Sequence, residues 1–170
     1  MKNLSIINQL ESHIPVMASL LNHDADHELI TWRPQAEKWC LLEIICHLVD
    51  EEMHDFRKRV RLALFPDQYK LEAIDPEGWV TSKRYMEQDY ETKIATWVSE
   101  RKASVEWLRS LNNPDWNSYF EHPQRGKVSA SFYLNNWLAH DYIHIRQITQ
   151  LKRAYLNQFG GQDLEYAGRW

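Results

Sequence analysis

The sequence has few of the residues that form flexible loops and disulfide bonds, and it lacks a long apolar run that could span a membrane. Its 170 residues include only five glycines and two cysteines, and no stretch of about 20 residues is predominantly apolar. Little glycine and 12% aromatic residues argue against a disordered or loop-rich chain. Near the N-terminus, Gln9, Glu11 and His13 interrupt the apolar run that a signal peptide would need. We therefore expect a soluble, cytoplasmic protein.

The two cysteines do not predict a disulfide. Cys40 and Cys46 are six residues apart on one expected helix, where their side chains would point in directions roughly 120–140° apart. Side chains that diverge in this way cannot be bridged. We expect two buried, reduced thiols.

The charge balance gives no broad cationic surface. The chain has 20 Lys and Arg against 24 Asp and Glu, a formal net charge of −4. Binding to nucleic acid or to anionic lipid generally requires a basic patch. We therefore expect a small-molecule substrate and no nucleic-acid or membrane partner.

Apolar residues recur at intervals of three and four in four segments, which predicts four helices. The expected helices cover residues 4–22, 41–64, 90–111 and 130–156. An interior proline removes a hydrogen bond, so Pro15 is expected to kink or break the first helix. The basic run 57–61 of the second helix is expected to face solvent.

The segments between these helices set the topology. Residues 65–88 contain prolines and a glycine and form a connection long enough to span a bundle, whereas residues 115–130 are expected to be an ordered loop. The tail after Tyr155 is expected to be irregular. With no convincing strand alternation and no repeat, the sequence predicts an all-α, antiparallel four-helix bundle as a single domain over residues 1–170.

Two histidines on the last expected helix are the first candidates for a site. His140 and His144 are four residues apart and share a helical face with apolar residues, so both imidazoles should face the interior or a cleft. His23 and His27 have the same spacing, but no apolar pattern surrounds them and they are expected at the surface. His47 lies on a flank of the second helix, where the residues alone also allow a core histidine bonded to a backbone carbonyl.

Three further histidines have weaker contexts. His13 and His54 are expected at the surface or behind a ligand, and His122 lies in a loop that could fold over the site. Tyr69, Trp79 and Tyr133 are further candidates for the open side of a site.

At this point the sequence resembles a known family, the DinB-like superfamily of small metal-binding four-helix proteins. The resemblance is carried by the strings WCLLEIICHLVDEE and WLAHDYIHIRQI, and it covers most of the chain. Further matching positions are Trp32, Arg33, Pro34, Trp39, Asp115, Trp116 and Gly126. The resemblance implies an up-down-down-up bundle and a divalent metal, zinc or nickel, held by His47, His140 and His144.

The same resemblance implies several chemistries. Members include thiol-dependent transferases that use bacillithiol or mycothiol, a thiol-dependent isomerase and metal-dependent hydrolases. Three imidazoles leave coordination positions open, as in catalytic rather than structural sites. We therefore expect a metal-dependent S-transferase or hydrolase, and the alternative is a bundle that holds a metal and binds a ligand or partner without turnover. A homodimer is a further expectation.

Two carboxylates are candidates to support these ligands. Each ligating histidine should donate its other ring N–H to an acceptor. Glu51 is one turn from His47 and is the preferred candidate, as a hydrogen-bond partner, general base or residue at the rim. Asp141 adjoins His140 and could instead be a surface residue.

Overall fold

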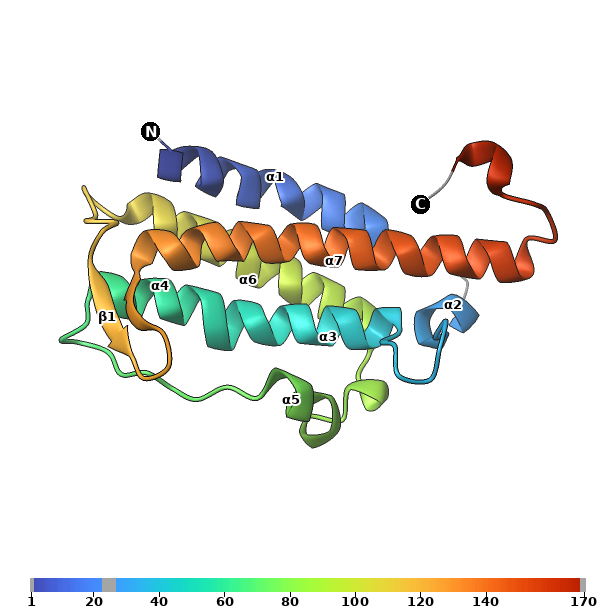
Figure 1. Ribbon diagram of the computed structural model, residues 1–170, viewed down its shortest axis with the longest axis horizontal. Coiled ribbons are helices and arrows are strands. Elements are labelled where there is room, and N and C mark those ends of the chain that lie inside the picture. Colours follow the sequence, from blue (N-terminus) through green and yellow to red (C-terminus); the bar gives the residue numbers. More distant parts are fainter. Residues whose placement is uncertain (1, 23–26, 169–170) are drawn as a thin grey trace.

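Four long helical rods form the molecule, as Figure 1 shows for the computed structural model. The structure describes residues 2–22 and 27–168. The rods are α1 (Lys2–Leu21), α3 (Leu41–Glu51) continued by a π-helix (Glu52–Phe56) and α4 (Arg57–Leu64), α6 (Tyr90–Ser110) and α7 (Ala130–Phe159). Shorter helical elements are α2 (His27–Thr31), α5 (Pro76–Ser82) and the 3-10 turns Tyr85–Glu87 and Glu165–Ala167.

The rods run up, down, down and up. Helices α1 and α7 point one way, and the α3–α4 rod and α6 point the other way (Figure 1). Helix α1 packs against α6 and α7, while the α3–α4 rod packs against the same two helices. Because the second and third rods are parallel, residues 65–89 must return along the length of the bundle, and they do so with α5 on the way. The expected all-α antiparallel bundle is confirmed.

Helix α1 passes through Pro15 without a break, so of the expected kink or break the break is wrong. Pro15 lies on the exposed face of the helix. The carbonyl that loses its helical partner there belongs to Glu11, which is also exposed, so water can take its place. The buried neighbours Ile14 and Met17 keep the helix docked on the core.

The second rod contains a π-helix that the apolar pattern did not predict. One wide turn over Glu52–Phe56 separates α3 from α4. At the start of α3, the carboxylate of Glu43 accepts the backbone N–H of Cys40 at 2.9 Å and also binds Arg33. The basic run is not wholly solvated, because Arg59 is buried and bonded to Asp55 at 2.7 Å.

The expected loop at residues 115–130 contains a small antiparallel hairpin. Strands β1 (Tyr119–His122) and β2 (Gly126–Ser129) pair with Phe120 opposite Val128. Phe120 and Val128 are buried and their neighbours are more exposed, but alternation over four residues is too short to stand out in a sequence. Gly126 has a φ of +67°, a backbone region that suits glycine.

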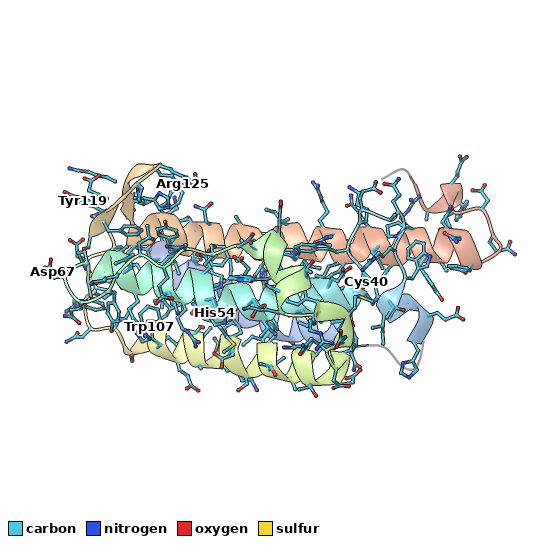
Figure 2. The ribbon with its side chains drawn as sticks, turned by 90° about the horizontal axis from the view of Figure 1, so that it is seen from below. Cys40, His54, Asp67, Trp107, Tyr119 and Arg125 are labelled. Carbon is cyan, nitrogen blue, oxygen red and sulfur yellow. The ribbon has the colours of Figure 1, made fainter. Side chains whose placement is uncertain are left out.

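A polar layer divides the core of the bundle. One apolar cluster runs through the half of the bundle that contains Cys40, and the other through the half that contains the hairpin, with Tyr119 and Arg125 marking the hairpin end in Figure 2. Between them each of the four rods contributes a buried polar side chain. These residues are His13, Glu52, Arg101 and Asp141.

Both cysteines are buried and free, as expected. In the described part of the chain no helix combines the length and the apolar character needed to cross a membrane.

Candidate metal centre

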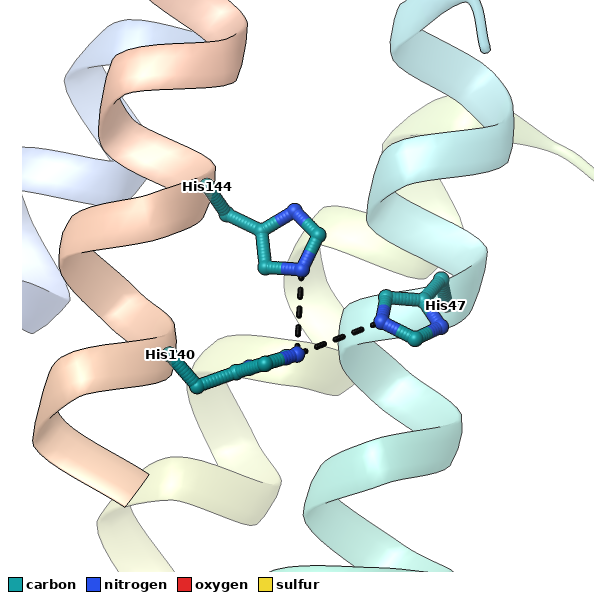
Figure 3. Close-up of side chains that lie close together, drawn as sticks. All are labelled: His47, His140 and His144. Carbon is teal, nitrogen blue, oxygen red and sulfur yellow. Dashed lines mark hydrogen bonds between the residues drawn. The ribbon is translucent and has the colours of Figure 1, made fainter. Parts of the chain in front are cut away.

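Three imidazoles from two rods converge at the level of the polar layer. His47 comes from α3, and His140 and His144 come from successive turns of α7 (Figure 3). The Nε2 atom of His140 lies 3.3 Å from that of His47 and 3.0 Å from that of His144. Two nitrogens bound to one zinc ion in a tetrahedron would be about 3.3 Å apart, given bonds of about 2.0–2.1 Å. The spacing therefore fits a shared cation, and these three residues form a group that could hold one.

Burial keeps these imidazoles neutral. Desolvation lowers the pKa of His47 to about 3 and that of His140 to about 2, and His144 is shifted in the same direction. The rings also disfavour each other's protonation, because His144 lies beside both other rings. Neutral imidazole is the form that binds a metal ion, so the cluster presents ligand lone pairs at neutral pH.

A hydrogen bond fixes the orientation of the His144 ring, whereas one ring nitrogen of His47 has no hydrogen-bond partner among the described residues. Nδ1 of His144 lies 2.8 Å from Oε1 of Gln147, so with this acceptor the proton is on Nδ1 and Nε2 carries the lone pair. Nδ1 of His47 is buried and has no partner among the described residues. The Nε2 atom of His140 is close to the Nε2 atoms of both His47 and His144, and a single proton on it cannot make two good hydrogen bonds. A cation would instead accept the lone pairs of all three Nε2 atoms.

Gln147 is a supporting residue that the sequence reasoning missed. It stands three positions after His144, so it lies on the same side of α7 one turn later. Carboxylates are common partners of metal-binding histidines, but a neutral amide oxygen accepts the imidazole N–H equally well in geometry.

Glu51 does not make the expected bond to His47. Its carboxyl is buried, and one of its oxygens has no hydrogen-bond partner in the described structure. Burial, followed by the charge and hydrogen bond of Asp55, raises the pKa of Glu51 to about 8. Along the rod, Glu51 lies between His47 and Asp55, and it makes no hydrogen bond to an imidazole.

Asp141 belongs to the polar layer and is not a surface residue. Its two oxygens accept hydrogen bonds from Arg101 at 2.7 and 2.8 Å, and Nδ1 of His13 lies 3.0 Å from one of them. Burial alone would raise the pKa of Asp141, but the Arg101 guanidinium lowers it. Arg101 also donates to Glu52 at 2.9 Å, and so does the indole N–H of Trp137 at 3.0 Å.

The polar layer thus ties all four rods together directly behind the imidazoles. Asp141 follows His140 in the chain, and Glu52 opens the π-helix one turn after His47. His13 was expected at the surface or behind a ligand, and the structure places it in this buried network, bonded to the residue that follows His140. A widened turn in the rod is a common feature beside functional sites.

A pocket of about 400 Å³ opens beside His140. Its walls come from the second rod, the hairpin and α7, and they include Phe56, His122 and Tyr133. His122 therefore does lie over the site, as its position in the sequence allowed. Trp79 instead packs near His54, and Tyr69 is exposed near Arg61.

A second pocket lies farther along α7. It has a volume of about 340 Å³ and is lined by residues that include Trp39, Gln147 and Leu151. The Trp39 ring lies 4.9 Å from the ring of His47, and Gln147 binds His144. The second pocket is therefore bordered by two side chains that contact imidazoles, although no imidazole lines it.

The remaining histidines lie outside the cluster. His27 is exposed, as expected, and His23 lies outside the described residues. The side chain of His54 is 39% exposed, and its Nε2 atom lies 3.7 Å from Oδ1 of Asp50.

Comparison with known proteins supports the assignment of the family and the fold. The family model of the DinB superfamily matches residues 9–148. The chain belongs to the DinB superfamily. A protein of Oceanobacillus iheyensis with the name "Putative metal-dependent hydrolase OB0782" is 24% identical over 149 residues, which is 86% of each chain.

This DinB-superfamily chain also resembles a solved structure. YfiT from Bacillus subtilis, described as a probable metal-dependent hydrolase with an unusual four-helix bundle topology, superposes with a TM-score of 0.76. The match covers 89% of this chain and 86% of YfiT at 20% sequence identity, and it supports the order and direction of the four rods.

Proposed function

We propose that this protein is a metal-dependent hydrolase of a small molecule, with the ion held by His47, His140 and His144. The observation that carries the proposal is the convergence of three neutral imidazole nitrogens, 3.0 and 3.3 Å apart, beside a pocket of about 400 Å³. Pockets of this size suit small organic substrates. The names of the two related proteins point to the same reaction class.

The three histidines would leave positions open for substrate and water. When bound, a divalent ion, zinc or nickel in our proposal, would supply a Lewis acid that polarises the substrate and lowers the pKa of a water or thiol. Gln147 holds His144 in the tautomer that offers its lone pair. Phe56, whose ring lies 5.0 Å from that of His140, shields the cluster from bulk water.

We propose that Glu51 supplies a proton to the reaction through Asp55. With a pKa raised to about 8, Glu51 is mostly protonated at neutral pH and hydrogen-bonds to Asp55. Asp55 lines the pocket beside His140, whereas Glu51 does not. This role differs from the general base that was one of three roles considered from the sequence, because burial makes Glu51 a proton donor at neutral pH.

Thiol transfer is the second candidate, and the pocket at Trp39 favours it. A transferase must bind a thiol and an electrophile together, and the second pocket borders Trp39 and Gln147, which contact His47 and His144. A hydrolase needs only one organic substrate. In this variant of the proposal, a low-molecular-weight thiol occupies one pocket and the electrophile occupies the other.

Metal analysis is the first test. Protein produced without a histidine tag should carry about one zinc or nickel ion per chain, as three-histidine catalytic sites do. His144→Ala should lose the ion, and His27→Ala should keep it because His27 is exposed and outside the cluster. A metal-free wild-type protein that cannot be loaded with either ion would refute the proposed function.

Activity measurements then separate the reactions. The loaded protein should cleave nitrophenyl esters or amides, and the activity should disappear in His144→Ala but not in His27→Ala. Conjugation of monochlorobimane to bacillithiol, mycothiol or glutathione without hydrolysis would favour transfer. Loading without either activity would support the alternative of a metal-holding bundle that binds a ligand or partner without turnover.

A further inference from the structure

We propose that the pocket beside His140 takes a molecule with an apolar body and a carboxylate end group, and that Arg125 binds the carboxylate. This inference deepens the proposed function, because it names the class of substrate for the same site. It depends on the lining of the pocket and on the charges there.

The charged side chains of the pocket leave one positive charge unbalanced. They are one carboxylate, Asp55, and two guanidiniums, Arg59 and Arg125, which gives a net charge of −1 + 2 = +1. Arg59 is already paired, because its Nε donates to Asp55 at 2.7 Å and its Nη2 to the backbone of Glu72 at 2.8 Å. The guanidinium of Arg125 has no ion-pair partner in the part of the chain that the structure describes.

The hairpin holds Arg125 at the rim of the pocket. Residues 122–126 form its turn, in which the backbone N–H of Arg125 donates to the carbonyl of His122 at 3.2 Å. A fixed turn of this kind positions the start of the Arg125 side chain against the pocket, although the residue itself is exposed. The chain as a whole has a formal net charge of −4, whereas the lining of this pocket is net positive.

His122 adds a second donor at the same rim. Its Nδ1 atom accepts the backbone N–H of Gln124 at 3.2 Å, so in the neutral ring the proton is on Nε2. A carboxylate has two oxygens that accept hydrogen bonds, and it can engage a guanidinium and a neighbouring N–H together.

The rest of the lining suits an apolar body. Phe132, Tyr133 and Ile143 from α7 line the pocket together with Phe56 and Ile74, and the amides of Gln124 and Asn136 complete the lining. His140 lies in the same lining, so an apolar body that fills the pocket connects the rim to the metal centre. A substrate held in this way is anchored by its carboxylate at one end and reacts at the other.

A binding experiment with matched probes tests this assignment. Phenylacetate and its neutral isostere phenylacetamide are titrated into isotope-labelled, metal-free full-length protein, and backbone amide signals are followed by NMR. Without the ion, a carboxylate cannot bind by ligating the metal. We expect phenylacetate to bind about 5-fold more tightly than phenylacetamide, the size of one partly solvated ion pair. The shifts should centre on residues 120–126.

The variants locate the charge. Arg125→Gln should remove the preference for phenylacetate and leave phenylacetamide binding unchanged. Arg146→Gln removes the same charge from an exposed position of α7 that lines neither pocket, and it should keep the preference. Equal binding of the two probes to the wild type, or an unchanged preference in Arg125→Gln, would overturn the inference.

The zinc-loaded protein separates this inference from the proposed function. If the histidines bind no ion, the proposed function fails while the probe comparison still decides the role of Arg125. If the ion binds and the probes do not distinguish charge, the function stands and the substrate class is wrong. Tighter binding of phenyl phosphate than of phenylacetate would also overturn the carboxylate assignment.

Discussion

Replacing Arg101 by methionine should destabilise the fold strongly. Arg101 is 1% exposed and is the counter-ion of two buried carboxylates, Glu52 and Asp141. Arg101→Met keeps much of the side-chain volume but leaves both carboxylates without a cation. Removing one partner of a buried ion pair costs about 3–5 kcal/mol. For a domain of this size each kcal/mol corresponds to about 2–4 °C, so the melting temperature should fall by roughly 6–20 °C.

Urea unfolding of the metal-free protein measures this cost directly, provided that the slope with denaturant stays the same. Arg109→Met is the matched control, because Arg109 pairs with Glu11 at the surface and should change stability by less than about 1 kcal/mol. The combination of Arg101→Met with Glu52→Gln and Asp141→Asn should recover part of the loss, because it removes the unpaired charges. A loss below about 1 kcal/mol in Arg101→Met, or no recovery in the triple variant, would refute the assigned role of the network.

Four further predictions follow from the titrating groups and the surface. The pKa of Asp141 is lower in the folded protein than its ordinary value of 3.8, so its contribution to the free energy of unfolding is complete above pH 3.8 and is lost as the pH falls through the folded pKa. The free energy of unfolding of Asp141→Asn should therefore fall less steeply between pH 5 and pH 2 than that of the wild type, as measured by unfolding curves at each pH. The pKa values of His47 and His140 are lowered to about 3 and about 2, so these two rings stay neutral between pH 7 and 6 and the zinc affinity should fall by less than about 3-fold over this range. A site of three imidazoles with ordinary pKa values would lose about 30-fold in zinc affinity over the same range. A competition titration with a chelator dye at the two pH values distinguishes these outcomes. Cys46, whose pKa burial raises to about 12, and buried Cys40 should not react with a disulfide reagent until the protein unfolds. We also propose a homodimer, and light scattering that gives the mass of one chain at micromolar concentration would contradict it.

The fold was largely predictable because each long rod carries its own apolar period. The spacing of Ile6, Leu10 and Met17 is enough to identify α1, and similar spacing identifies the other three rods. The errors are local, and two of them show why. A four-residue strand such as Tyr119–His122 has too few alternating positions to differ from a loop, and Pro15 is tolerated because the helix face that carries it is exposed.

The site was predicted less completely than the fold, for a physical reason. The pairing of His140 with His144 follows from helix geometry, but the approach of His47 depends on how two rods pack, and the family resemblance supplied that residue. Gln147 and the true surroundings of Asp141 depend on side-chain directions that a period of 3.6 residues does not specify. Glu51 was identified as a carboxyl near the site, but its protonation depends on burial beside Asp55.

The polar layer explains why a dication can be held at this level of the bundle. A charged group is costly in an apolar core unless an opposite charge lies near it. Glu52 and Asp141 carry two negative charges against the one positive charge of Arg101, so these three side chains have a net charge of −2 + 1 = −1. Since Asp141 directly follows His140, this negative charge lies immediately behind the imidazoles. The same network that orders the four rods therefore also favours a cation over an apolar ligand at the three histidines.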